Sequence, residues 1–237
     1  MFAPEAIAHR GVRDRYPENS LPAFQAAIDA GADAIELDVH ATRDGVIVVH
    51  HDAALSAESR SPHAGRAIAA LDLSELADFE IAPGIAIPTL EEVLQALAPS
   101  TRIYIEIKAP AIEALVAELL VQSPASRGRC AVHSFDHRIA RRFGGLASSV
   151  PTGILEVGYP VDPPSLLRAA NARDLWQQYE FIDRELITGI HAAGGRVIAW
   201  TCNDVAEWEQ LREMRVDGIC TDRIEANVAW LREEKAT

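Results

Sequence analysis

Charged and titratable side chains stand near the ends of several short apolar runs in this 237-residue sequence. They comprise three carboxylates, two histidines and two cations, namely Glu36, Asp38, Glu106, His9, His51, Arg10 and Lys108. Carboxylate oxygens are hard ligands that suit Mg²⁺ or Ca²⁺. Histidine titrates near neutral pH, and two of them suit a general acid and a general base. Because arginine grips phosphate oxygens bidentately, the set predicts a site that stabilises a phosphoryl transition state.

The spacing of these residues supports a common site. Glu36 and Asp38 lie two residues apart in "DAIELDV", and Glu106 and Lys108 repeat that spacing in "RIYIEIK". Residues two apart in a strand point to the same side. Each motif taken by itself is more typical of a solvated strand end or an ion pair. The prediction therefore depends on the convergence of separate pieces of sequence.

A predicted hairpin links His51 to this group. The segment "HATRDGVIVVHHD" follows the second apolar run and carries Asp44-Gly45 between two strand-like stretches. Asp-Gly between alternating apolar residues is a strong hairpin signal. If these two residues form the turn, the residue numbers of paired positions sum to 89, and Asp38 faces His51. A slip of one residue would bring His50 there instead.

The elements that must position these residues alternate along nearly the whole chain. Strands are expected at 5–9, 33–39, 102–108, 130–134, 152–157, 196–201 and 217–221, with a weaker candidate at 175–181. Helices are expected at 20–30, 89–98, 111–122, 136–145, 163–170, 184–193, 204–213 and 224–232. Eight strand–helix pairs favour an α/β barrel, in which catalytic groups gather at the carboxyl ends of the strands. The weak candidate strand keeps a doubly wound sheet as the alternative.

One domain over residues 1–237 is expected, with a small insertion after the second strand and its hairpin. The insertion covers about 53–86, where alanine and serine are frequent and the regular pattern lapses. Pro88 and Thr89 restart that pattern. We see no internal repeat and no low-complexity linker.

The remaining histidines and the cysteines are expected to be structural. His40, His63, His133, His137 and His191 are assigned to surface or core positions. His133 is the least secure of these assignments because it ends a predicted strand. The three cysteines lack metal-type spacing, and we expect buried free thiols.

Composition narrows the class of protein. The formal net charge is −13, which argues against a general nucleic-acid binder because such a protein needs a basic face. Hydrophobic residues make up 49% of the chain and charged residues 24%, as in ordinary globular proteins. No apolar stretch is long enough for a membrane span, and the first ten residues lack the pattern of a signal peptide. We therefore expect a cytoplasmic protein with a small-molecule partner, while its oligomeric state stays open.

The amino-terminal block "IAHRG…YPENSLPAF…GADAIELDVHATRDGVIVVHHD" resembles the signature of the glycerophosphodiester phosphodiesterases. The resemblance continues in the expected order through "IPTLEEVL", "IYIEIK", "HSFD", "WTCND" and "DGICTD". It implies a (βα)8 TIM barrel with a small insertion after the HD motif. It also implies metal-dependent hydrolysis of a glycerophosphodiester to sn-glycerol 3-phosphate and an alcohol.

The resemblance also implies roles for individual residues. His9 and His51 would be the acid–base pair, and Glu36, Asp38 and Glu106 would hold one divalent metal ion, Mg²⁺ or Ca²⁺. Arg10 and Lys108 would contact the phosphate, and Trp200 would help to line the glycerol pocket. The glycerol hydroxyl would act as the nucleophile and give a cyclic phosphate, which water then opens.

Two other functions fit parts of the same pattern. A related lipid phosphodiesterase of the phospholipase D or sphingomyelinase type shares the histidines and the carboxylates. Such enzymes are usually secreted and disulfide-bonded, which the odd number of cysteines disfavours. A barrel that binds phosphodiesters without cleaving them is the alternative from a different class, and retention of every polar group in the set speaks against it.

Overall fold

The computed structural model describes residues 2–59 and 61–236. Within them, eight parallel strands close into a barrel because β1 pairs with both β2 and β11. The strands are β1 (Glu5–His9), β2 (Ala34–Ala41), β6 (Arg102–Ile107), β7 (Cys130–Ser134), β8 (Thr152–Glu156), β9 (Asp174–Gln178), β10 (Arg196–Trp200) and β11 (Gly218–Thr221). The weak candidate is thus a barrel strand, and it ends at Gln178 rather than Phe181. The expected α/β barrel is confirmed, and the doubly wound alternative is wrong.

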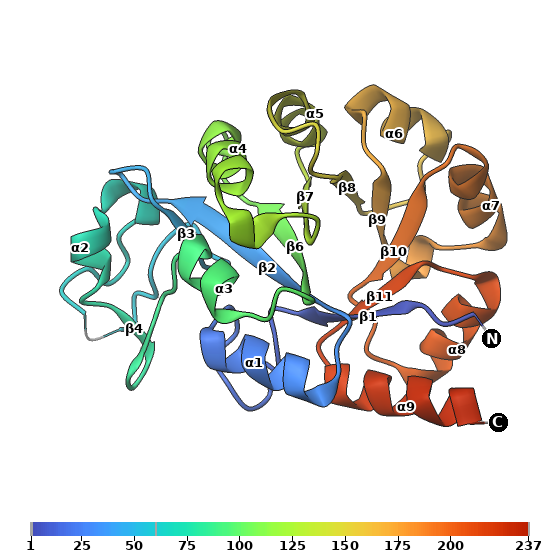
Figure 1. The fold of residues 1–237 in the computed structure, drawn as a ribbon, viewed down its shortest axis with the longest axis horizontal. Helices are drawn as coiled ribbons and strands as arrows, with labels where there is room; N and C mark the ends of the chain where they lie inside the picture. The colour runs from blue at the N-terminus through green and yellow to red at the C-terminus, as the bar shows by residue number, and fades with distance from the viewer. Residues whose placement is uncertain (1, 60, 237) are drawn as a thin grey trace.

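Helices follow the strands and surround the barrel (Figure 1). They are α1 (Leu21–Ala30), α3 (Leu90–Ala96), α4 (Glu113–Gln122), α5 (His137–Leu146), α6 (Pro163–Ala170), α7 (Arg184–Ala192), α8 (Val205–Met214) and α9 (Ile224–Ala236). Local sequence sets several of their ends. Ser20 caps α1 by accepting from the Ala23 N–H, and α3 begins with a capping box between Thr89 and Glu92. None of the described helices has the length and apolarity needed to cross a bilayer.

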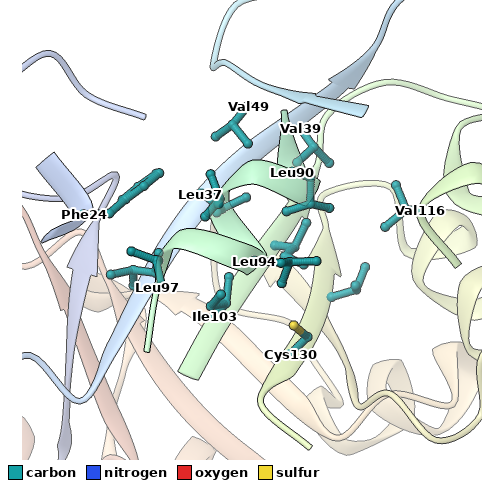
Figure 2. Close-up of a cluster of buried hydrophobic side chains, with 14 of the residues drawn as sticks. Phe24, Leu37, Val39, Val49, Leu90, Leu94, Leu97, Ile103, Val116 and Cys130 are labelled. Carbon is teal, nitrogen blue, oxygen red and sulfur yellow. The ribbon is translucent and has the colours of Figure 1, made fainter. Parts of the chain in front are cut away.

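Apolar side chains fill the space on both sides of the barrel wall. Inside it, Tyr104, Trp176 and smaller residues from the other strands form a buried layer below the carboxyl ends of the strands. Outside it, the strands pack against the helices, and Figure 2 shows Leu37 of β2, Ile103 of β6 and Leu94 of α3 in one such cluster. Because these side chains fill the barrel interior, a ligand would bind at the carboxyl ends of the strands and not inside the barrel.

The hairpin differs from the expected register by one residue. β3 (Ile47–Val49) pairs antiparallel with β2 so that Val39 faces Val49, and paired residue numbers sum to 88. The Thr42 N–H donates to the Val46 carbonyl at 2.9 Å, which leaves a loop of three residues between them. Gly45 ends this loop with a φ of +83°, a conformation that glycine adopts without strain.

This register overturns one step of the sequence argument. The His50 N–H, not that of His51, donates to the Asp38 carbonyl, at 3.0 Å. The prediction that Asp38 faces His51 across the hairpin was therefore wrong. The physical reason is the three-residue loop, since the Asp-Gly signal does not by itself distinguish two loop residues from three.

The segment between the hairpin and α3 has its own short elements. These are η1 (Ile68–Ala70), α2 (Leu73–Leu76), β4 (Glu80–Ala82) and β5 (Ile85–Ala86). They lie beside the barrel, next to β3 and α3 (Figure 1). Leu55, Ile68, Leu71, Leu76 and Phe79 are buried in a small apolar cluster with Val48 of β3. This packing attaches the insertion to the hairpin that carries His51.

Candidate active site

A cavity of about 240 Å³ opens at the carboxyl ends of the barrel strands. Its lining comprises His9, Arg10, Glu36, His51, Glu106, Lys108, His133, Phe135, Leu155, Trp176, Trp200, Thr201 and Cys220. Seven of the eight residues predicted from the sequence are in this lining. The eighth, Asp38, lies beside it and pairs with both cations of the lining. The fold therefore brings together residues that are up to 191 positions apart.

Asp38 holds the two predicted phosphate ligands. Its buried carboxylate lies 3.0 Å from Arg10 Nε and 3.4 Å from Lys108 Nζ, and it accepts from Asn19 Nδ2 at 2.8 Å. Burial by itself would raise the pKa of Asp38, but Arg10, Lys108 and Asn19 outweigh burial and lower it. Arg10 Nη1 also donates a hydrogen bond to Glu18, at 2.9 Å. Both cations are thus held at the cavity before any anion arrives.

Glu36, Glu106 and His133 form a buried group whose potential ligand atoms all lie within 4.8 Å of one another. Burial, and next the charge of Asp38, raises the pKa of each glutamate to about 7. Glu36 Oε2 is buried and has no hydrogen-bond partner among the described residues. Glu106 contacts Lys108 Nζ at 3.1 Å, so one cation already faces this group. The remaining buried carboxylate oxygens fit a divalent cation, which would supply a positive charge and a coordination partner for Glu36 Oε2. Asp38 lies outside this group, and its predicted role as a metal ligand stays a prediction.

His133 is a residue that the sequence reasoning did not assign to the site. It was expected to be structural, yet its side chain lines the cavity beside the two glutamates. Burial lowers its pKa to about 4, so its imidazole is neutral at physiological pH. The signal that could have found it is its place as the first residue of "HSFD", near the carboxyl end of β7, where the parallel register sets it beside Glu106.

His9 is held by a carboxylate that the sequence reasoning also missed. Its Nδ1 lies 2.7 Å from Asp222 Oδ1, which leaves Nε2 as the nitrogen available to the cavity. Asn203 donates to Asp222 at 2.8 Å, and Arg13 donates at 3.1 Å. Burial by itself would raise the pKa of Asp222, but His9, Asn203 and Arg13 hold it well below its usual range. Asp222 stands in the motif "DGICTD", to which no role was given.

His51 follows β3, the second strand of the hairpin, and lines the same cavity. Its Nδ1 lies 2.8 Å from Asp52 Oδ1, and this hydrogen bond is the largest cause of the lowered pKa of Asp52. Its backbone carbonyl accepts from His40 Nε2 at 3.0 Å. His50 is not part of the cavity lining, and its Nδ1 contacts the backbone of Asp52. The choice of His51 over His50 thus agrees with the cavity, although the register argument for it was wrong.

One wall of the cavity is aromatic. Trp200 meets Phe135 edge to face, with ring centroids 5.4 Å apart, and Lys108 Nζ lies 6.0 Å from the centre of the Phe135 ring. The indole N–H of Trp200 is buried without a hydrogen-bond partner among the described residues. This wall offers apolar surface next to the charged residues, which suits the carbon skeleton of a small polar ligand.

Residues 9–226 match the model of the glycerophosphoryl diester phosphodiesterase family. The chain belongs to this family. A Mycobacterium tuberculosis protein named "Probable glycerophosphodiester phosphodiesterase 2" is 36% identical over 92% of this chain and 87% of its own length. A glycerophosphodiester phosphodiesterase of Caldanaerobacter subterraneus is 30% identical over 96% of this chain and 97% of its own length.

A solved structure shows the same fold. The phosphodiesterase of Oleispira antarctica, in complex with its product sn-glycerol 3-phosphate, superposes with a TM-score of 0.84 at 23% identity and covers 97% of both chains. The family resemblance and the barrel predicted from the motifs are therefore confirmed. The expected enzyme class is confirmed as well, since the family and its named members are phosphoric diester hydrolases.

Proposed function

We propose that this protein hydrolyses glycerophosphodiesters to sn-glycerol 3-phosphate and an alcohol, with His9 and His51 as the acid–base pair. The observation that carries the proposal is that both histidines line one cavity with Arg10 and Lys108. Each histidine is also bound through Nδ1 to a carboxylate, which orients the ring and leaves Nε2 for proton transfer. The product bound to the Oleispira antarctica phosphodiesterase is of the expected class.

Two displacements, each with two proton transfers, account for the proposed reaction. One histidine takes the proton of the glycerol 2-hydroxyl, whose oxygen attacks phosphorus. The bond from phosphorus to the alcohol oxygen breaks, the other histidine protonates that oxygen, and a cyclic phosphate remains. Water then adds to phosphorus with the histidines in exchanged roles, which opens the ring and restores both protonation states. Arg10 and Lys108 hold the phosphate oxygens in line for both displacements.

Glu36 and Glu106 are the proposed ligands of a divalent metal ion, and Asp38 is retained as the third carboxylate of the predicted set. When bound, the ion supplies Lewis-acid stabilisation of the charge on the phosphoryl oxygens. The expectation of Mg²⁺ or Ca²⁺ followed from a set of ligands made only of oxygen atoms. Asp38 also keeps Arg10 and Lys108 in place, a role that does not depend on the ion.

Release of sn-glycerol 3-phosphate, measured by a coupled assay, tests the proposal. The substrates are the choline, ethanolamine, inositol and glycerol diesters, each with and without a chelator. We expect chelator-sensitive release that falls about 10²- to 10⁴-fold in His9→Ala and in His51→Ala. His191→Ala is the matched control, because His191 contacts Asp217 and does not line the cavity. Near-normal turnover by His9→Ala would overturn the assignment.

A further inference from the structure

His133 has no part in the proton transfers proposed above, yet it lines the reaction cavity. Its side chain is 1% exposed. Parallel pairing sets it beside Glu106, and its ring stacks on Trp176 with centroids 4.3 Å apart and planes 10° from parallel. The ring therefore has a defined place and plane within the group that it forms with Glu36 and Glu106.

The hydrogen bonds of His133 do not account for its position. Nδ1 is buried without a partner among the described residues. Nε2 lies 3.7 Å from Glu36 Oε1, which is beyond hydrogen-bond distance. A core histidine normally satisfies its ring nitrogens, because an unpaired buried polar group is costly. An imidazole held this way beside two buried carboxylates is arranged as a ligand would be.

We infer that His133 is a nitrogen ligand of the divalent ion that Glu36 and Glu106 hold, and that it makes the site prefer an ion of the Mn²⁺, Co²⁺ or Zn²⁺ class to Mg²⁺ or Ca²⁺. The inference rests on the metal site of the proposed function. Mg²⁺ and Ca²⁺ take oxygen ligands almost exclusively, whereas borderline transition ions accept imidazole nitrogen readily. The mixed set thus differs from the all-oxygen set expected from the sequence.

Metal titration of the chelator-treated protein tests the inference. Transition ions bind most sites more tightly than Mg²⁺, so the informative quantity is the change caused by His133→Gln. We expect this variant to bind Co²⁺, followed by its visible absorption, at least about tenfold more weakly, and Mg²⁺ within about threefold of the wild type. His191→Gln should bind both ions as the wild type does. Equal weakening of both ions, or unchanged Co²⁺ affinity, would overturn the inference.

Pulsed electron paramagnetic resonance of the Mn²⁺-loaded wild type gives a second readout that does not depend on the folding of a variant. We expect coupling of the ion to a directly bound nitrogen, and a spectrum without it would overturn the inference.

Hydrolysis assays separate this inference from the proposed function. If the wild type shows the nitrogen coupling but releases no sn-glycerol 3-phosphate with any ion, the ligand assignment stands and the reaction is wrong. If it hydrolyses diesters while Co²⁺ affinity is unchanged in His133→Gln, the reaction stands and the ligand assignment is wrong.

Discussion

Substitution of Asp222 tests how the site orients the His9 ring and supports its role in proton transfer. Its carboxylate accepts from His9 Nδ1 at 2.7 Å, so Nε2 is presented to the cavity, and its charge stabilises the imidazolium formed during proton transfer. Asp222→Asn keeps the size of the side chain and an oxygen for Asn203 but removes that charge. The new amide can also donate to Nδ1, which would place the His9 proton on the wrong nitrogen.

The size of the effect follows from the geometry. A hydrogen bond to a charged group is worth about 1.5–3 kcal/mol. The side chains of His9 and Asp222 are 16% and 27% exposed, so solvent screens the interaction in part. The lower part of the range, about 1.5–2 kcal/mol, corresponds to a loss of about 10- to 30-fold in kcat/KM. A population of the wrong tautomer adds to this loss, so tenfold is the lower bound.

The assay is release of sn-glycerol 3-phosphate by Asp222→Asn under saturating metal, with thermal unfolding as a check on stability. Asp217→Asn is the matched control, because Asp217 makes the same kind of contact, 2.8 Å to His191 Nε2, away from the cavity. We expect the control to hydrolyse substrate as the wild type does. A kcat/KM for Asp222→Asn within about twofold of the wild type would refute the role given to this carboxylate.

Three further predictions concern stability. Gly11→Ala should lower the free energy of unfolding by about 2 kcal/mol or more. Gly11 has a φ of +87°, and a Cβ at this position would lie 2.6 Å from the backbone of Ala23. An unchanged midpoint of chemical denaturation would contradict this prediction. Since the pKa values of Glu36 and Glu106 are raised from 4.5 to about 7, the metal-free protein binds extra protons there and loses stability as pH rises through that window. A divalent ion should therefore raise Tm more at about pH 8 than at about pH 5, and equal shifts would argue against the raised values. Arg129→Met should cost about 2–4 kcal/mol in urea unfolding, because this buried guanidinium donates to three carbonyls at the end of α3, and a smaller loss would mean that water replaces it.

Local patterns were enough to predict most elements. The bounds expected for β1 and β7 match the structure, because each is a short apolar run that ends at polar residues. The same alternation predicted that Glu36 and Asp38 point to the same side of their strand, since side chains on one face recur every second residue. Capping residues predicted helix starts because they act locally: Ser20 accepts a hydrogen bond from the backbone N–H three residues further along the chain.

The register of the hairpin could not be predicted from local sequence. Its turn was expected from Asp44-Gly45, but the register depends on whether the loop closes over two residues or three, and both closures use glycine at a positive φ. The three-residue loop that forms places His50 opposite Asp38. His51 lies beyond the paired residues of β3, and its side chain lines the cavity.

The sequence by itself determined the alternating elements, the shared side of Glu36 and Asp38 and the motifs by which the family is recognised, because these depend on residues that are close together in the chain. Only the tertiary structure decided which partners complete the site. Asp222 is 213 positions from His9 in the sequence, so no local pattern connects the two residues. They meet because β11 pairs with β1 and closes the barrel. His133 likewise joins this group through strand pairing. Parallel register sets it beside Glu106, whereas Glu36 is in register with Tyr104, two residues before Glu106 on the same strand. The three side chains meet only because three strands are paired at once, which no local pattern in the sequence shows.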